Sequence, residues 1–210
     1  MQEHGQLIIV AAPSGAGKTS LVREVVKKMP DVVVSVSHTT REPRDGEING
    51  VHYHFVDPFQ FKTMIQDQIL LEYAQVHNEF YGTSKHFVQR NLMAGRDVIL
   101  EIDCQGAFQV KQDYPDALLI FILPPSMQAL HDRLKKRGKD SDAVILGRLE
   151  VAKKELACAT DFDYLVINDD FDYATLALCS IIQAGHLRVV FQKKVHHTLL
   201  AELTRKEIDV

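Results

Sequence analysis

The stretch Gln6-Leu-Ile-Ile-Val-Ala-Ala-Pro-Ser-Gly-Ala-Gly-Lys-Thr19 decides the fold of this chain. Its first half, Gln6–Ala11, is a short apolar run of β-branched character that proline and glycine end, which predicts a buried strand. A helix is predicted from Gly17 to Met29 because the apolar residues there fall on one helical face. A glycine-rich turn between a strand and a helix can direct backbone N–H groups at an anion, so this stretch indicates a phosphate-binding P-loop.

The turn matches the P-loop pattern G-x-x-x-x-G-K-[ST] except at its first position, where Ala12 replaces glycine. Alanine is tolerated there if its φ is negative and strained if its φ is positive. Lys18 would reach the β and γ phosphates of a nucleotide, and the Thr19 hydroxyl would bind Mg²⁺, partly through water. A glycine-rich turn without a ligand is the alternative. The residues that we assign to nucleotide phosphates are Ser14, Gly15, Ala16, Gly17, Lys18, Thr19 and Ser20.

Length and composition are those of an ordinary globular protein. The chain has 210 residues, of which 46% are apolar and 25% charged. This length fits one large α/β domain, with or without inserted lobes, or at most two small domains. The formal net charge of −4 argues against a protein that binds nucleic acid through its overall field. A bound anion must therefore be held by a local cluster of cations.

Cysteine usage and the N-terminus predict a cytoplasmic protein. Cys104, Cys158 and Cys179 are few and widely spaced, which fits reduced thiols in a reducing cytosol, and we expect a packing role for Cys104. The first residues lack a basic segment before a long apolar core, so no signal peptide is expected. No apolar run approaches the roughly 20 residues of a membrane span, and the ten histidines show no recognised metal-ligand spacing.

Strand-like and helix-like segments alternate along the chain, which favours a mostly parallel sheet with helices on both faces. Residues 37–90, which hold no long buried strand, and the charge-dense residues 133–154 interrupt this alternation, so both are predicted to be insertions. The final residues, 187–210, are amphipathic and their structure is left open. Further strands are expected at 32–36, 97–102, 118–123 and 164–167, and further helices at 104–112, 126–137, 142–159 and 171–185.

A second anion site is indicated by arginines and tyrosines after the second predicted strand. Arg41 and Arg44 lie three residues apart, Tyr53 follows in an alternating segment, and Tyr81 lies further on. Arginine suits bidentate phosphate binding, and a tyrosine hydroxyl can donate to the same group. Two phosphate sites, one of them a P-loop, suggest transfer between two nucleotides. For the arginines, solvated surface charge is the alternative.

The run T-T-R-x-x-R-x-x-E-x-x-G-x-x-Y-x-F, at residues 39–55, resembles the signature of the guanylate kinase family, and every fixed position is filled. The likeness covers essentially the whole chain. Its further matches are the P-loop, Glu72, Tyr81-Gly82-Thr83, Glu101–Gly106, Arg137–Ser141, Arg148 and Val166–Asp170. It implies an α/β fold in three parts: a P-loop NTPase core whose parallel sheet is flanked by helices (residues 1–36, 91–127 and 156–210), an inserted GMP-binding lobe (37–90) and a helical lid (128–155).

The resemblance also implies the reaction, in which the γ-phosphoryl group of Mg²⁺-ATP passes to GMP and yields ADP and GDP. GMP and ATP are then the partners, with no nucleic acid or membrane, and a homo-oligomer is left open. The implied GMP-phosphate residues are Ser37, Arg41, Arg44, Tyr53 and Tyr81, and the guanine residues are Glu72, Thr83 and Asp103. Lys18, Arg41, Arg137 and Arg148 are the implied catalytic residues, and Asn168 and Asp169 resemble adenine-side contacts.

Chemistry supports the choice of base. Guanine presents N1–H and its exocyclic amine as adjacent donors, and one carboxylate, here Glu72, can accept both, whereas adenine has an acceptor at N1. A site that satisfies hydrogen bonds in this way can reject the wrong base by roughly 10⁴ or more. By itself, Glu72 reads equally well as an exposed strand residue. The sequence leaves open which of Glu101 and Asp103 would orient water around Mg²⁺.

Lid arginines would supply charge for the transfer step. Arg133 and Arg137 are four residues apart and share a helix face, and Arg148 follows on the next predicted helix. Cations there would neutralise a transition state whose charge is spread over the moving phosphoryl group. An exposed, ion-paired helix pair is the alternative reading.

Two other functions remain as alternatives for the whole chain: a non-catalytic phosphopeptide-binding module of this family and a kinase for another monophosphate. A regulatory GTPase is disfavoured because no N-K-x-D motif occurs.

Overall fold

The computed structural model describes residues 5–76, 78–136 and 142–204. Within these ranges the core is a parallel five-stranded sheet in the order β2-β7-β1-β8-β9. Every residue of β1 is buried, which suits a central strand that is covered on both faces. The parallel sheet predicted from the sequence is therefore present. Its strands are β1 (Leu7–Ala11), β2 (Val32–Val34), β7 (Asp97–Glu101), β8 (Leu118–Leu123) and β9 (Tyr164–Ile167).

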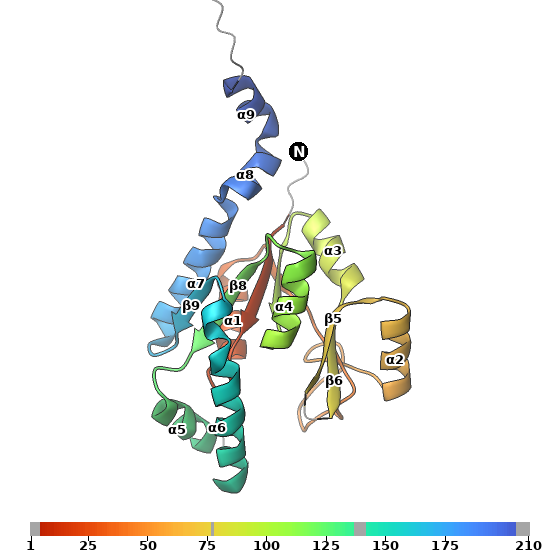
Figure 1. Cartoon of the computed structure of the whole chain (residues 1–210), viewed down its shortest axis with the longest axis vertical. Coiled ribbons are helices and arrows are strands. Elements are labelled where there is room, and N and C mark those ends of the chain that lie inside the picture. Colours follow the sequence, from red (N-terminus) through yellow and green to blue (C-terminus); the bar gives the residue numbers. More distant parts are fainter. Residues whose placement is uncertain (1–4, 77, 137–141, 205–210) are drawn as a thin grey trace, which may run out of the picture.

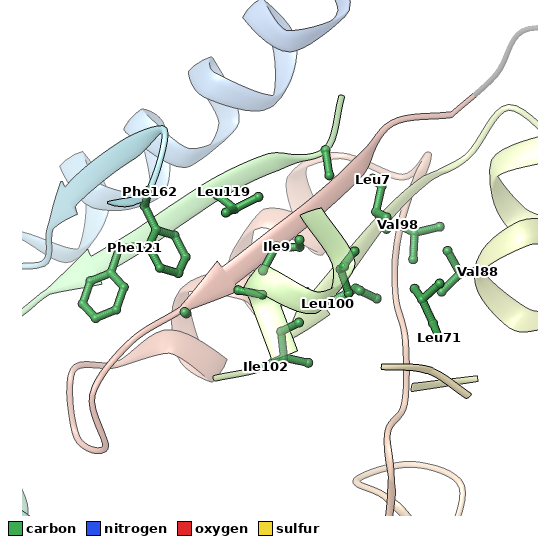
Figure 2. Close-up of a cluster of buried hydrophobic side chains, with 14 of the residues drawn as sticks. Leu7, Ile9, Leu71, Val88, Val98, Leu100, Ile102, Leu119, Phe121 and Phe162 are labelled. Atoms are coloured by element: carbon green, nitrogen blue, oxygen red, sulfur yellow. The ribbon is translucent and has the colours of Figure 1, made fainter. Parts of the chain in front are cut away.

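Alternate residues of β1 divide between two apolar clusters. Leu7 and Ile9 join a cluster on the face that α3 and α4 cover, and Ile8 and Val10 join another on the face that α1 and α7 cover. In the first cluster (Figure 2), Leu71 from outside the parallel sheet packs with the core strands, which ties the neighbouring lobe to the core. The covering helices are α1 (Lys18–Lys28), α3 (Lys85–Met93), α4 (Cys104–Asp113) and α7 (Phe171–His186).

A second, mixed sheet lies within residues 37–90, with the strand order β4-β3-β6-β5. Strands β5 and β6 pair antiparallel, and β3 pairs parallel with β4 and antiparallel with β6. Helix α2 begins with a capping box in which Asp57 and Gln60 each accept a backbone N–H of the other. The elements are β3 (His38–Thr39), β4 (His54–Phe55), α2 (Pro58–Gln66), β5 (Leu70–Val76) and β6 (Glu79–Ser84).

Two helices, α5 (Met127–Lys136) and α6 (Asp142–Ala157), form a separate unit beside the core. They pack on one another through a small apolar cluster of Leu130, Leu134, Ile145 and Ala152. Figure 1 shows them projecting below the core, apart from β5, β6 and α2, which lie on its other side. A short 3₁₀ turn at Ala159–Asp161 then leads into β9.

The residues that follow α7 form two short helices, α8 (Val189–Val195) and α9 (His197–Leu203). They extend from α7 away from the sheet, as Figure 1 shows. In the part of the chain that the structure describes, no single helix is long and apolar enough to cross a membrane, and α7 and α8 reach that length and composition only as a pair bent by 54°.

Cys104 and Cys158 form a disulfide, which corrects the expectation of reduced thiols and of a packing role for Cys104. Cys104 is the first residue of α4, and Cys158 directly follows α6, 54 residues later. Sequence spacing could not reveal this pair because only the fold brings the two helix ends together. Cys179 has a free thiol and is buried in the cluster beneath α1 and α7, as expected of a small apolar residue.

Reduction of this disulfide should lower the stability of the fold. Closing a loop of 54 residues removes entropy from the unfolded chain worth about 4 kcal/mol at most. Chemical denaturation of protein oxidised with glutathione disulfide, with and without dithiothreitol, measures the difference. Cys158→Ser is the matched control and should not respond to the reductant. An unchanged denaturation midpoint of the unsubstituted protein, or three titratable thiols after unfolding without reductant, would contradict the pairing.

Candidate active site

The P-loop turn connects the central strand β1 to α1. Gly15 and Gly17 both have φ of +96°, a conformation that glycine adopts without strain. Ala12 is not among the described residues with positive φ, so its methyl group is accommodated in place of the first glycine of the motif. The departure from the P-loop pattern therefore leaves the turn intact.

Lys18 and Thr19 lie against the carboxyl end of β7. The Lys18 ammonium donates to the carbonyl of Ile102 at 3.2 Å, and the Thr19 hydroxyl donates to Glu101 Oε2 at 2.9 Å. Burial lowers the pKa of Lys18, and the carboxylates of Glu101, Glu155 and Asp103 oppose this shift. Thr19 and Glu101 together present hard oxygen donors, which is the donor set that Mg²⁺ prefers.

Glu72 is a buried carboxylate that lines a cavity next to Lys18. Its side chain is 3% exposed, and Glu72 Oε1 accepts the hydroxyl of the fully buried Thr83 at 2.6 Å. Burial raises the pKa of Glu72 to about 7, helped by the nearby charge of Asp103 and only partly offset by the bonds from Thr83. Thr83 thus orients Glu72, and a ligand that donates hydrogen bonds would favour the ionised carboxylate.

The N-terminus of α4 completes this cavity. Asp103 caps the helix by accepting the N–H of Gly106 at 2.8 Å. A Cβ atom on Gly106 would lie 2.7 Å from Glu72 Oε2, so glycine at this position leaves room for the carboxylate. The sequence left the roles of Glu101 and Asp103 open, and the structure gives the two residues different neighbours. Glu101 lies with Thr19, while Asp103 lies with Glu72.

A bulge in β5 explains why consecutive residues face inward. Its pairing with β6 shifts between Leu70 and Glu72, and both Leu71 and Glu72 are buried although side chains normally alternate along a strand. Leu71 thereby packs into the core cluster while Glu72 enters the cavity. The alternative reading of Glu72 as an exposed strand residue is therefore wrong.

Arg41 is held by a carboxylate that the sequence did not single out. Its Nη2 atom donates to both oxygens of Glu47 at 2.9 Å, and the guanidinium lies 5.4 Å from the centre of the Tyr53 ring. Burial would raise the pKa of Glu47, but the bonds from Arg44 N and Arg41 hold it below its usual range. Glu47 is a fixed position of the quoted signature run, which is the signal that could have found it.

Two adjoining cavities connect these groups. One, of about 490 Å³, lies between α1, β2 and residues 47–53 of the neighbouring lobe, and it includes Thr19. The other, of about 200 Å³, includes Glu72, Tyr81 and Asp103. The residues that line both cavities are Lys18, Ser37, Tyr53 and Glu101. Lys18 therefore lies where the two cavities meet.

Comparison with known proteins identifies the chain. The guanylate kinase family model matches residues 4–185. The chain belongs to the guanylate kinase family. The guanylate kinase of Coxiella burnetii is 50% identical over 201 residues, which cover 96% of this chain and 98% of that protein. The guanylate kinase of Escherichia coli K12 is 49% identical, with 95% and 97% covered.

A solved structure agrees with this family in its fold. The crystal structure of guanylate kinase from Anaplasma phagocytophilum superposes with a TM-score of 0.76 at 28% identity, and the match covers 90% of this chain and 89% of that one. The guanylate kinase resemblance stated from the motifs is therefore confirmed.

Tyr53 lies beside Arg41 and lines both cavities. Other residues expected from the guanylate kinase motifs lie outside the two cavities, and of these Arg44, Ser14, Ser20 and Asp169 are exposed. Asn168 is buried and its amide donates to the P-loop carbonyl of Ala16. Arg133 donates to the carbonyls of Asn168 and Ala16, and Arg148 lies on α6. Arg137 lies outside the described residues.

Glu72→Gln should stabilise the fold at neutral pH. Because burial raises the pKa of Glu72 from 4.5 to about 7, the folded protein retains a proton that the unfolded chain releases near pH 4.5. The stability of the unsubstituted protein therefore falls as pH rises from 4.5 to 7. Glutamine does not titrate, so the advantage of the variant should grow across this window to as much as about 3 kcal/mol.

Denaturation at pH 4.5 and pH 7.5 measures this difference. Glu79→Gln is the matched control because Glu79 also accepts a threonine hydroxyl, that of Thr40 at 2.6 Å, but lies nearer the surface. A Glu72→Gln advantage that is the same at both pH values would show that burial does not perturb this carboxyl.

Substitutions in the P-loop should show that Ala12 can be replaced without gain in turnover, whereas the glycine at position 17 is required. Ala12→Gly should lower stability by about 0.4–1 kcal/mol through unfolded-chain entropy and should not improve ATP turnover. Gly17→Ala should reduce turnover at least about tenfold, because it places an L residue at φ +96° and its methyl would collide with the Asn168 amide. Steady-state kinetics and thermal melts measure both, and a gain in turnover for Ala12→Gly would show that the first position does need glycine.

Proposed function

We propose that the chain phosphorylates GMP with ATP through a division of labour between its P-loop and the cavity of Glu72. The P-loop takes Mg²⁺-ATP, and the cavity of Glu72 takes GMP. The observation that carries this proposal is that Lys18 of the P-loop also lines the cavity of Glu72, so that it can contact the donor phosphates and the acceptor phosphate from one position. A P-loop protein with only one nucleotide would not need a second cavity built around a buried carboxylate.

On the donor side, the backbone N–H groups of the P-loop and the start of α1 surround the phosphates. Thr19 and Glu101, whose side chains contact each other, would hold Mg²⁺ directly or through water. When bound, the ion neutralises phosphate charge and orients the γ-phosphoryl group. Asp169, exposed in the turn after β9, remains the proposed contact on the adenine side.

On the acceptor side, Glu72 would accept the N1–H and amine donors of guanine. Thr83 fixes the orientation of Glu72, and Asp103 adds a second acceptor on the wall of the cavity. Buried polar groups of this kind reject a base that leaves them unpaired, which is why adenine should be a poor acceptor base.

The GMP phosphate would lie near Tyr53 and Tyr81, whose rings contact each other edge to face. Burial raises the pKa of Tyr53, so its hydroxyl remains a donor at neutral pH. Arg41 is prepared for the phosphate because Glu47 already holds its guanidinium beside Tyr53. Ser37 lines both cavities, and Arg44, exposed in this structure, would join the phosphate when the 37–90 lobe closes.

Transfer then proceeds by in-line attack of a GMP phosphate oxygen on the γ-phosphorus of ATP. The attacking oxygen is already anionic, so no general base is required. The new P–O bond forms as the bond to the ADP oxygen breaks, and Lys18 with Arg137 and Arg148 from the proposed 128–155 lid stabilises the charge. Closure of the lid would exclude water and prevent hydrolysis of ATP. We place the enzyme in the cytoplasm.

An ADP-forming assay across a panel of acceptors tests the proposal. GMP should support turnover, and AMP, UMP or dTMP at equal concentration should give rates lower by about 10³-fold or more. Arg41→Ala should raise KM for GMP about tenfold or more while KM for ATP changes little, because it removes a charge-assisted phosphate contact. Comparable rates with all acceptors would contradict the base assignment.

Lys18→Ala provides the test of the transfer step itself. It should fold with an unchanged melting profile while losing ADP formation, since the charge acts on the transferring group. Binding of a phosphopeptide without ADP formation by the unsubstituted chain would instead favour a non-catalytic module.

A further inference from the structure

Asn168 joins the turn after β9 to the P-loop. Its side chain is 5% exposed, and its Nδ2 atom donates to the carbonyl oxygen of Ala16 at 2.7 Å across 152 residues of sequence. The backbone of Asn168 is itself fixed, because its N–H donates to the carbonyl of Leu123 at the end of β8 at 2.8 Å. The amide therefore reaches the P-loop from a rigid position in the sheet.

This contact controls the direction of one phosphate-binding donor. The peptide between Ala16 and Gly17 is trans and planar, so its C=O and N–H groups point in opposite directions. Because Asn168 draws the Ala16 carbonyl to one side of the loop, the Gly17 N–H is directed to the other side. A Cβ on Gly17 would collide with the Asn168 amide, which shows that the amide packs directly against this peptide.

Arg133 of α5 strengthens the same arrangement. Its Nη2 atom donates to the Asn168 carbonyl at 2.8 Å, and its Nη1 atom approaches the Ala16 carbonyl at 3.4 Å. Leu130 and Leu134 of the same helix pack beside Gly15, where a Cβ would lie 3.0–3.1 Å from them. Helix α5 therefore covers the P-loop directly.

We propose that Asn168 is a positioning residue for phosphoryl transfer, which orients the Ala16–Gly17 peptide so that the Gly17 N–H faces the phosphates of ATP, with Arg133 holding Asn168 in place. This assigns the buried amide to the loop rather than to the adenine base. The inference rests on the proposed binding of ATP at the P-loop. It predicts that loss of the amide weakens every ligand whose phosphates bind at the P-loop, whatever its base.

The test compares ATP with inorganic tripolyphosphate, a probe that has the phosphate chain and no base. KM for ATP and the inhibition constant of tripolyphosphate against ATP are measured at constant excess of free Mg²⁺ for the full chain and for Asn168→Ala. Both constants should rise by a similar factor of about ten or more, while KM for GMP changes less than about twofold. Asn168→Asp, which places an acceptor opposite the carbonyl, should lose at least as much.

Asn91→Ala is the matched control. Asn91 is also 5% exposed and also donates its amide to a backbone carbonyl, that of Phe87 at 2.8 Å, but within α3. Asn91→Ala should lower the melting temperature without changing KM for ATP or the inhibition constant of tripolyphosphate. Where Asn168→Ala does not fold, Asn168→Asp or Asn168→Ser supplies the same comparison.

Three results would overturn the inference: a loss for ATP with unchanged tripolyphosphate inhibition, no loss for either ligand, or an equal kinetic loss in Asn91→Ala. The first would return Asn168 to the adenine side. If the unsubstituted chain neither uses ATP nor binds tripolyphosphate, the proposed function fails instead, and the two failures are distinguishable.

Discussion

The constraint on which the structure depends is the turn between β1 and α1. The chain leaves the centre of the sheet at Ala11 and begins a helix at Lys18, yet it must keep its N–H groups available for phosphate. Two glycines at φ +96° allow this reversal. Because β7 is the immediate neighbour of β1, its carboxyl end delivers Glu101 and the Ile102 carbonyl to Lys18 and Thr19. The two cavities then meet at Lys18 and Glu101 as a consequence of strand order.

The cavity proposed for GMP shows how recognition can oppose stability. Burial raises the pKa of Glu72 to about 7, and the hydrogen bonds from Thr83 offset this only in part. The fold reaches this position through a bulge in β5 and leaves space for the carboxylate at Gly106. In the proposed function, a ligand with two adjacent donors would supply hydrogen bonds to this buried carboxylate, so the cost of burying Glu72 would itself contribute to selectivity.

Much of the core could be predicted because its signals are local. The runs at 118–123 and 164–167 became β8 and β9 without change of bounds, and the helix expected at 104–112 became α4 at Cys104–Asp113. The lobe was harder, since β5 and β6 carry polar residues and a bulge that break the alternation. The Cys104–Cys158 disulfide and the bond from Asn168 to Ala16 join residues whose spacing in the sequence carries no signal.

The sequence by itself determined the P-loop, the parallel α/β core and the membership of a nucleotide kinase family, because each follows from residue types at fixed short spacings. Only the tertiary structure decided that Glu72 is buried, that Glu101 lies with Thr19 while Asp103 lies with Glu72, and that the Asn168 amide donates to the P-loop carbonyl of Ala16. The physical reason is that the pKa of a carboxyl and the partner of an amide depend on desolvation and on contacts between distant segments, which exist only after the chain has folded.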